Sequence, residues 1–342
     1  MNTAGGFVAS TLDMADADFM AGRLNFSGKG ASASVSNAGR ISAGSGAYVA
    51  LLGGAVSNSG YISVPLGKVA LGSGEQVALD VNGGGFMQVA VPTSLLTGSN
   101  ALIDNSGSIT ARGGTVVLQA AVLKDAVRNV INMAGSINAD SATGDGGTIH
   151  LIGGADTSSM AGTVTVSGSL SAQATGASGN GGFIETSGAH VNLNGLRVNT
   201  GAAHGKTGTW LIDPTDFTVA ASGGDITGAQ LSANLNATGV TIDSNNGASG
   251  INGDVNFNDA VTWSTNNGLN VSAFRNININ AAITNTNPNS TNINLLADDT
   301  GTGTGTVTFG AGGSINTVGA FVNIFYNPTS YATPTDFTVN VP

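Results

Sequence analysis

The sequence predicts an all-β protein built as a parallel β-helix, a solenoid in which short strands stack coil upon coil. Glycine is roughly twice as frequent as usual, with 53 glycines in 342 residues. These glycines stand beside short stretches in which apolar and polar residues alternate, as they do in strands. Segments also recur: "VSNAGRISA" at 35–43 returns as "VSNSGYISV" at 56–64, 21 residues later. Internal repeats of this kind indicate a repeat architecture.

Three longer repeats define the strand cores. They are "NSGSITARGGTVVLQA" (105–120), "MAGSINADSATGDGGTIHLIG" (133–153) and "VSGSLSAQATGASGNGGFIETSG" (166–188), and their Gly-Gly pairs lie 33 and 35 residues apart. Insertions of variable length between constant strand cores favour a solenoid over the structural alternative, a β-sandwich. Alternate residues after each Gly-Gly pair should point inward. These are Val116, Leu118 and Ala120, then Ile149 and Leu151, then Ile184 and Thr186.

Stacking is needed because no single repeat can bury its apolar side alone. Placing each strand above its counterpart buries all of these sides and pairs the internal backbone groups. A coil of about 21 residues advances about 4.8 Å, so the whole chain would give roughly 15 coils and a rod on the order of 70 Å long. Asparagine and glycine at the corners tolerate the left-handed backbone that tight turns require.

The last third of the chain continues the pattern with more asparagine. Four further strands are expected there: "NININ" (276–280), "NINLL" (292–296), "TVTF" (306–309) and "FVNIFY" (321–326).

One short helix is expected over residues 228–238, within "ITGAQLSANLNATGV". Thr227 can cap its first turn, and Gln230 three residues later completes a capping box. Gly239 should end it, since glycine readily adopts the backbone that follows a helix. We expect the helix to pack against the side or end of the rod.

Charge excludes some classes of partner. The net charge is −10, only 10 residues are Lys or Arg, and no basic cluster is present. Nucleic acid is therefore not an expected partner, because phosphate binding needs local positive charge. Cysteine is absent, which rules out disulfides and thiolate metal sites. No window approaches the roughly 18 apolar residues that a membrane-spanning helix needs.

Candidate sites for chemistry are weak. "GAAHGKT" (201–207) has three residues between its glycines where a phosphate-binding loop has four, so His204 and Lys206 are expected to be solvated loop residues. His150 and Glu185 follow their Gly-Gly pairs at the same position and should point outward in one column. We expect a solvated pair, or no contact, between them.

A glycan-cleaving site would need two carboxylates held about 5 to 9.5 Å apart. Glu185, Asp213 and Asp216 are the candidates, but no Asp cluster with interleaved Arg or Lys accompanies them. Asp213 is explained as a turn residue before Pro214 that bonds its own backbone. The calcium-binding nonapeptide, the G-x-S-x-G elbow and H-E-x-x-H are not matched. The sequence therefore predicts no catalytic, cofactor-binding or metal-binding residues, no cofactor, and no enzyme activity.

Two segments carry a family resemblance: "GGFIETSGAHVNLNGLRVNTG" (181–201) and "GTWLIDPTDFTV" (208–219). Together with "GFVASTLDMADADFMAGRLNFSGKG", "GRISAGSGAYVALLG" and "GKVALGSGEQVALDVNG" in the amino-terminal part, they resemble the filamentous haemagglutinin-like adhesins, the exoproteins of bacterial two-partner secretion. The resemblance implies a right-handed β-helix, export through an outer-membrane pore-type transporter partner, and display on the surface of a Gram-negative bacterium. Members act in adhesion, haemagglutination or biofilm formation, and some carry toxin regions far downstream.

The early secretion motif of that family, an Asn-Pro-Asn-Gly type turn, is not found in the amino-terminal region; "NPNS" lies at 287–290 instead. We therefore expect Met1 to be an internal start, with the beginning of the secretion domain missing. Three regions are expected: the later part of a secretion-type β-helix (1–92), β-helix repeats (93–219), and a short helix followed by an Asn-rich β-helix (220–342).

The segment "GTWLIDP" should close the first run of coils as a joint between two blocks of scaffold. Trp210 and Ile212 would fill the core, and Pro214 would end the strand. "PTDFTV" recurs at 334–339 and would mark a second joint. The residues of the expected structural motif are Glu185, Trp210, Leu211, Ile212, Asp213 and Pro214.

The expected function is that of a secreted adhesin stalk, a non-catalytic virulence-type surface protein. Outer faces rich in Asn, Thr and Ser would hold a glycan or protein receptor of a host or neighbouring cell through many weak contacts. Two alternatives stay open, namely the stem of a contact-dependent toxin or haemolysin and a polysaccharide-degrading β-helix enzyme.

Overall fold

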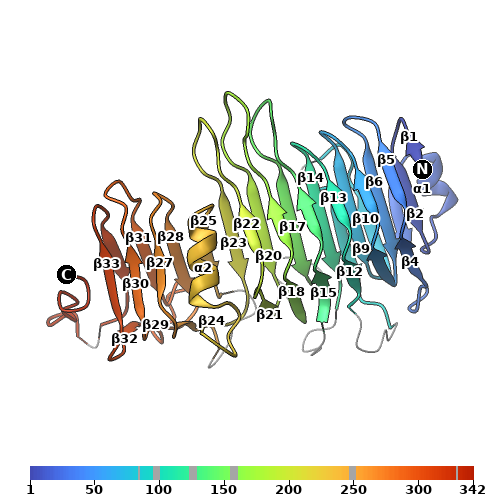
Figure 1. The fold of residues 1–342 in the computed structure, drawn as a ribbon. Coiled ribbons are helices and arrows are strands. Elements are labelled where there is room, and N and C mark those ends of the chain that lie inside the picture. The colour runs from blue at the N-terminus through green and yellow to red at the C-terminus, as the bar shows by residue number, and fades with distance from the viewer. Residues whose placement is uncertain (84, 95–100, 123–128, 155–160, 246–251, 329) are drawn as a thin grey trace.

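The computed structural model describes residues 1–83, 85–94, 101–122, 129–154, 161–245, 252–328 and 330–342, and it confirms the parallel β-helix. The chain winds as an elongated rod with its two ends at opposite tips (Figure 1). One sheet, here the long sheet, runs the whole length. Its strands are β2 (Phe7–Ser10), β6 (Tyr48–Gly53), β9 (Lys68–Ser73), β14 (Thr115–Ala120), β17 (Thr148–Gly153), β20 (Phe183–Ser187), β23 (Thr209–Asp213), β25 (Gly239–Asp243), β28 (Leu269–Ala273), β31 (Ile293–Ala297) and β34 (Val322–Phe325).

Two further sheets complete each coil in the amino-terminal half. Sheet 2 contains β1 (Asn2–Thr3), β5 (Arg40–Ala43), β8 (Tyr61–Ser63), β13 (Ser108–Thr110), β16 (Ser136–Asn138), β19 (Ser169–Ser171) and β22 (Arg197–Asn199). Sheet 3 contains β4 (Ser34–Asn37), β7 (Ala55–Asn58), β12 (Ile103–Asn105), β15 (Asn129–Met133), β18 (Thr163–Val166) and β21 (His190–Asn192).

In the carboxy-terminal half, two different sheets replace sheets 2 and 3 on the remaining sides of the coil. Sheet 4 contains β24 (Phe217–Val219), β26 (Val255–Phe257), β29 (Ile277–Ile279) and β32 (Val307–Phe309). Sheet 5 contains β27 (Val261–Trp263), β30 (Ala282–Asn285) and β33 (Ser314–Thr317). The four strands expected in this Asn-rich part are therefore present, as β29, β31, β32 and β34.

The register of the strands follows the sequence repeats. Val35 lies beside Val56, and Ile149 lies between Val116 and Ile184, all in parallel pairs. The pairing excludes a β-sandwich. The residues expected to point inward after each Gly-Gly pair are fully buried.

The rod is shorter than expected. Eleven strands stack in the long sheet among the described residues, where roughly 15 coils were predicted. At about 4.8 Å per step they span roughly 50 Å. The difference arises because many residues lie in loops and in additional elements rather than in the three strands of a coil.

A glycine column explains the Gly-Gly pairs. Gly114, Gly147, Gly182 and Gly208 stack in successive coils, and a Cβ on any of them would run into the backbone carbonyl of the glycine below. Only glycine allows the coils to approach this closely at the corner before the long sheet.

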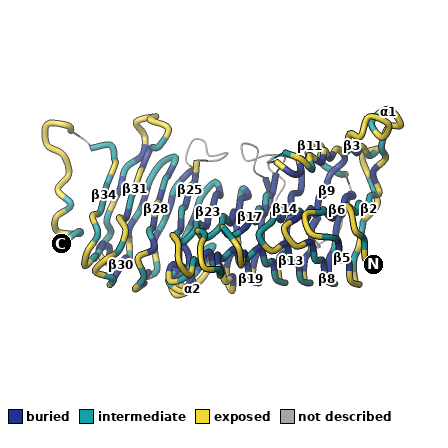
Figure 2. Tube along the Cα trace, turned by 90° about the horizontal axis from the view of Figure 1, so that it is seen from above, coloured by how far each residue is buried: buried dark blue, intermediate teal, exposed yellow. Residues whose placement is uncertain are grey.

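Three antiparallel strands form a cover sheet that the sequence did not predict: β3 (Leu24–Ser27), β10 (Gln76–Leu79) and β11 (Met87–Val91). It lies on the outer face of the long sheet near the amino-terminal end (Figure 2). Ala50 and Leu52 of β6 point outward into it and are fully buried beneath Phe86 and its neighbours. This part of the chain therefore has a second hydrophobic core outside the rod.

Two helices are present among the described residues, where one was expected. The first, α1 (Asp16–Met20), lies at the amino-terminal end and was missed. The second, α2 (Gly228–Leu235), starts as expected, with Thr227 accepting a hydrogen bond from the Gln230 backbone N–H at 3.2 Å. It ends at Leu235 rather than at residue 238.

The expected capping box and stop of α2 are both wrong in detail. The Gln230 side chain donates to the Leu196 carbonyl at 2.7 Å, so it is bound to the neighbouring coil rather than to the Thr227 backbone. Gly239 does not end the helix, because it is already the first residue of β25. Tertiary contacts override both local signals.

The sheets change at one place, which we call the joint. Sheets 3 and 2 end at β21 and β22, sheets 4 and 5 begin at β24 and β27, and the long sheet alone continues, through β23 and β25. Helix α2 occupies the place between β22 and β27 where a strand would otherwise lie (Figure 1).

The second "PTDFTV" segment does not form a second joint. The first copy contains β24, whereas the second ends in a turn at residues 338–340. Phe337, directly before that turn, packs on the rings of Phe309 and Tyr326, with ring centroids 5.6 and 4.8 Å apart. The two copies thus share sequence but not conformation.

Candidate functional site at the joint

The two segments that carry the family resemblance form neighbouring strands. β20 contains "IETS" and β23 contains "WLID", and they pair in parallel so that Ile184 lies beside Trp210 and Thr186 beside Ile212. Because β20 and β23 are neighbouring strands of the long sheet, each residue of one segment lies directly beside a residue of the other.

On the inner side, Trp210 and Ile212 are fully buried. The indole N–H of Trp210 donates to the Thr186 hydroxyl at 3.0 Å, and Thr186 is also fully buried. A buried indole N–H needs such a partner. A threonine at an otherwise aliphatic inward position is thereby explained.

On the outer side, Glu185 is only 5% exposed, so the expectation of a solvated pair or no contact with His150 is wrong. Its carboxylate lies 2.7 Å from Nδ1 of His150 and also accepts a hydrogen bond from the Ser187 hydroxyl at 2.9 Å. The alternation of the strand does place Glu185 and His150 in one outward column. Neighbouring side chains then enclose the carboxylate.

The other residues of the expected motif end the strand. Leu211 is half-buried beside Glu185. Asp213 is the last residue of β23, and its carbonyl accepts from the Gly188 N–H at 3.2 Å. Pro214 is buried directly after it. A bond from the Asp213 side chain to its own backbone stays a prediction.

Helix α2 bonds to the exposed edges of the strands on both of its sides. Toward β22, the Asn234 side chain accepts from the Val198 N–H at 3.0 Å and donates to the Leu196 carbonyl at 3.2 Å. Toward β27, the Ser232 hydroxyl accepts from the Thr262 N–H at 2.8 Å. Polar side chains of the helix thus replace the ladder bonds that a strand would supply.

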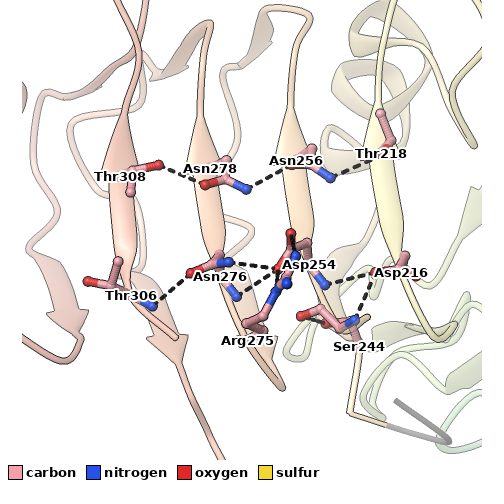
Figure 3. Close-up of polar contacts among 11 residues, drawn as sticks. Asp216, Thr218, Ser244, Asp254, Asn256, Arg275, Asn276, Asn278, Thr306 and Thr308 are labelled. Atoms are coloured by element: carbon pink, nitrogen blue, oxygen red, sulfur yellow. Dashed lines mark hydrogen bonds and ion pairs between the residues drawn. The ribbon is translucent and has the colours of Figure 1, made fainter. Parts of the chain in front are cut away.

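Beyond the joint, sheet 4 carries two rows of polar side chains on its outer face (Figure 3). The upper row is an amide ladder. Asn278 donates to the Asn256 side chain at 2.9 Å and accepts from the Thr308 hydroxyl at 2.7 Å. Asn256 in turn donates to the Thr218 hydroxyl at 3.4 Å. These bonds link four successive coils.

The lower row is charged. Asp216 accepts from the backbone N–H groups of Gly253 and Asp254 at 2.8 and 3.0 Å. Asp254 accepts from Nε of Arg275 at 2.7 Å and from the Asn276 backbone at 3.1 Å. Burial alone would raise the pKa of Asp254, but Arg275 and Asn276 outweigh it and hold that pKa below its ordinary value.

Asp225 lies next to the lower row and is affected in the opposite direction. Its carboxylate accepts from the Thr218 N–H at 2.7 Å. Burial is the main cause that raises its pKa to about 6, and the nearby charge of Asp216 adds to the effect. Asp254 is thus held ionised, whereas Asp225 tends to keep its proton in mildly acidic solution.

The three carboxylates considered for glycan cleavage occupy different structural roles. Glu185 is enclosed by His150 and Ser187, Asp213 ends β23, and Asp216 binds the backbone of the next coil. No group of three or more His, Asp or Glu side chains that could hold a metal ion occurs among the described residues. His204 and Lys206 are exposed in their loop. Within the described ranges, no helix is long and apolar enough to cross a membrane.

Comparison with known proteins does not assign this chain to a family. No family model matches the sequence, and no curated protein does. The chain is similar to the secretion domain of HMW1 from Haemophilus influenzae, with 20% identity and a TM-score of 0.46; the match covers 94% of this chain and 75% of that one. This likeness is too distant to show a family, and the β-helix is established here by the strand pairing of the chain itself.

Proposed function

We propose that this chain is part of a secreted exoprotein of bacterial two-partner secretion and serves as the non-catalytic stalk of a filamentous haemagglutinin-like adhesin. One observation carries the proposal. The segments "IETSG" and "TWLIDP" lie on adjacent rungs in register, and the Thr186 hydroxyl accepts the hydrogen bond of the Trp210 indole. Residues that carry the family resemblance thus support one another at the joint.

The outer surface suits adhesion through many weak contacts. Amide and hydroxyl side chains repeat along sheet 4 at the spacing of the coils, and hydrogen bonds to neighbouring coils hold them in place. Groups that are already ordered lose little conformational entropy when a receptor binds. A glycan or protein receptor on another cell fits such a surface, and a pore-type transporter in the outer membrane would be the export partner.

Cell binding tests the adhesin proposal. The purified, fluorescently labelled chain is titrated onto epithelial and bacterial cells and followed by flow cytometry. We expect saturable binding that an excess of unlabelled chain displaces, and that chain unfolded by heat does not show. Absence of saturable binding to every cell type would contradict adhesion. For export, deletion of the transporter gene in the source bacterium should remove the chain from the cell surface.

The non-catalytic part of the proposal has its own test. Purified chain is incubated with pectins, alginate and glycosaminoglycans, and unsaturated and reducing ends are measured. We expect no release. Clear release would overturn this part, and Glu185→Gln and Asp216→Asn variants would then identify the carboxylate responsible.

A further inference from the structure

Two adjoining hollows lie on the outer face of the long sheet in the carboxy-terminal half. Their volumes are about 950 and 330 Å³, and both are lined by Thr241, Asn270 and Asn294. We call the combined depression the groove. It crosses β25, β28 and β31, and the smaller hollow reaches Phe325 on β34.

An amide ladder lies along the floor of the groove at Asn270 and Asn294 and continues to Asn323 on β34. Asn323 donates to the Asn294 side chain at 2.8 Å, and Asn294 donates to Asn270 at 2.6 Å. Each asparagine side chain has two N–H donors and an oxygen with two lone pairs, so a ladder bond uses only part of its capacity. Asn270 is exposed and the other two are half-buried. Oriented amide groups therefore remain available to a ligand along the axis of the rod.

An apolar strip runs beside the ladder. Leu296 and Phe325 lie next to each other on β31 and β34, and they are 39% and 58% exposed. They point to the same side as the amides, two residues further along each strand, so about 7 Å separates the two columns. A large exposed aromatic side chain next to ordered polar groups is typical of a binding site.

The charge of the groove indicates which ligands it suits. Lys206 is the one ionisable side chain among the described residues that line the two hollows, although the chain as a whole has a net charge of −10. A charged partner would meet no matching set of opposite charges. A sugar ring fits better, because its hydroxyl groups can bond to amides while its C–H face packs on an aromatic ring.

We propose that the groove binds a neutral oligosaccharide that lies along the rod axis across β25, β28, β31 and β34. The Asn270, Asn294 and Asn323 amides hydrogen-bond to its hydroxyl groups, and one sugar ring packs on Phe325. This site rests on the proposed adhesive function and gives it a ligand class.

Titration calorimetry on the whole chain tests the site. The probes are cello-, xylo-, manno- and galacto-hexaose, with hexagalacturonate as the charged counterpart. We expect at least one neutral hexaose to bind and hexagalacturonate to bind more weakly. Phe325→Ala and Asn294→Ala should each weaken binding about tenfold or more, since truncating a central contact has an effect of this size.

Asn132→Ala is the matched control. Asn132 also donates its amide to a neighbouring coil, to the Asp104 side chain at 2.6 Å, but it lies on β15 of sheet 3, outside the groove and outside sheet 4, so its loss should leave hexaose binding unchanged. Circular dichroism checks that each variant is folded. No binding of any neutral hexaose would overturn the proposal, as would tighter binding of hexagalacturonate or equal effects of the Asn294 and Asn132 variants.

Cell binding by the same variants tests the groove proposal and the adhesin proposal separately. If Phe325→Ala and Asn294→Ala lose hexaose binding and also cell binding, the groove is the adhesive site. If both variants keep full cell binding, the groove is not the receptor site and the adhesin proposal stands without it. If the unmodified chain binds hexaose but no cells, the groove is supported and the adhesin proposal fails.

Discussion

The two halves of the rod have similar side chains in the core but different side chains on the outer face of the long sheet. Inward residues of the long sheet are mostly aliphatic or aromatic on both sides of the joint, with Thr186 as one exception. In the amino-terminal half, its outward residues Ala50, Leu52 and Ala70 are apolar and lie beneath the cover sheet. In the carboxy-terminal half, the outward column contains Asn270 and Asn294 and is open to solvent. The inward side chains of the long sheet stabilise the fold, whereas its outward side chains determine what the outer face of the sheet can bind.

Asparagine shows the same contrast. In the amino-terminal half, Asn58 and Asn105 lie inside the corner of the coil, fully buried, with Asn58 donating to Asn105 at 2.7 Å. In the carboxy-terminal half, Asn256 and Asn278 form their ladder on the outer face. The same side-chain bond is therefore part of the core in one half and of the surface in the other. The energetic cost of breaking it should differ accordingly.

A pair of phenylalanine variants should show the largest difference between the halves. Phe86 is 1% exposed beneath the cover sheet and packs edge-on against Tyr48, with ring centroids 6.4 Å apart. Phe86→Ala should destabilise the cover sheet by about 3–5 kcal/mol, because it leaves a cavity. Phe325→Ala, at an exposed position, should change stability by about 0.5 kcal/mol or less.

Hydrogen exchange followed by mass spectrometry measures this pair. Amides of β10 and β11 should exchange faster by a factor on the order of 10² or more in Phe86→Ala, and amides of β31 and β34 should be unaffected in Phe325→Ala. Equal effects would show that the cover sheet is not a second core.

Asp225 should make the stability of the region after the joint depend on pH. Its pKa is about 6 in the folded chain and near 3.8 when unfolded. The folded state therefore holds the proton more tightly, so its stabilising contribution is complete below about pH 4 and is lost as pH rises through 6. The loss should be about 2–3 kcal/mol.

Asp225→Asn isolates this effect. Asparagine can still accept from the Thr218 N–H but does not titrate. Urea unfolding of both proteins should give similar stabilities at pH 4, whereas the variant should be more stable at pH 7. A constant difference between them at all pH values would contradict the assignment.

The buried and exposed asparagine ladders can be compared directly. Asn58→Ala should cost about 2 kcal/mol, since it leaves the buried Asn105 oxygen without its donor. Asn278→Ala removes an equivalent bond on the surface and should cost about 0.5 kcal/mol, because water can replace the lost partner. Thermal unfolding measures both. Similar costs would mean that location does not decide the strength of the ladder.

Among the changes to buried groups, the smallest loss of stability is expected at the joint. Thr186→Val keeps the shape of the side chain but leaves the buried Trp210 N–H without a partner, which should cost about 1–2 kcal/mol. Thr241→Val, on the outer face of the same sheet, is the control and should be nearly neutral. Urea unfolding followed by tryptophan fluorescence measures the difference, and a neutral Thr186→Val would mean that the bond does not stabilise the joint.

The sequence predicts the inside of the rod better than the outside. Strand alternation with a period of two is a local signal, so residues such as Leu118 and Leu151 could be placed in the core without a structure. The cover sheet could not, because β3 and β10 pair antiparallel across about 50 residues. One signal was present: "YVALLG" is apolar on both faces, which is typical of a strand covered on both sides.

The joint was predictable in part for the same reason. Alternation placed Trp210 inward and Glu185 outward, but it does not report what surrounds an outward residue. His150 encloses Glu185 because the preceding coil brings it there, whereas Ser187 lies two residues further along the same strand. The cap of α2 at Thr227 is local and was found. The bond from Gln230 to Leu196 depends on the neighbouring coil, so the sequence did not predict it.

The replacement of a strand by α2 has a mechanical consequence. Along most of the rod, a pulling force on the ends is shared by three backbone ladders. At the joint, a single strand ladder, between β23 and β25, bears the load, assisted by isolated backbone bonds such as that from the Leu193 N–H to the Asp225 carbonyl and by side-chain bonds such as that between Ser232 and Thr262. Under tension, the rod should part first at this point, and single-molecule pulling should record a first rupture there that shifts to lower force in Ser232→Ala.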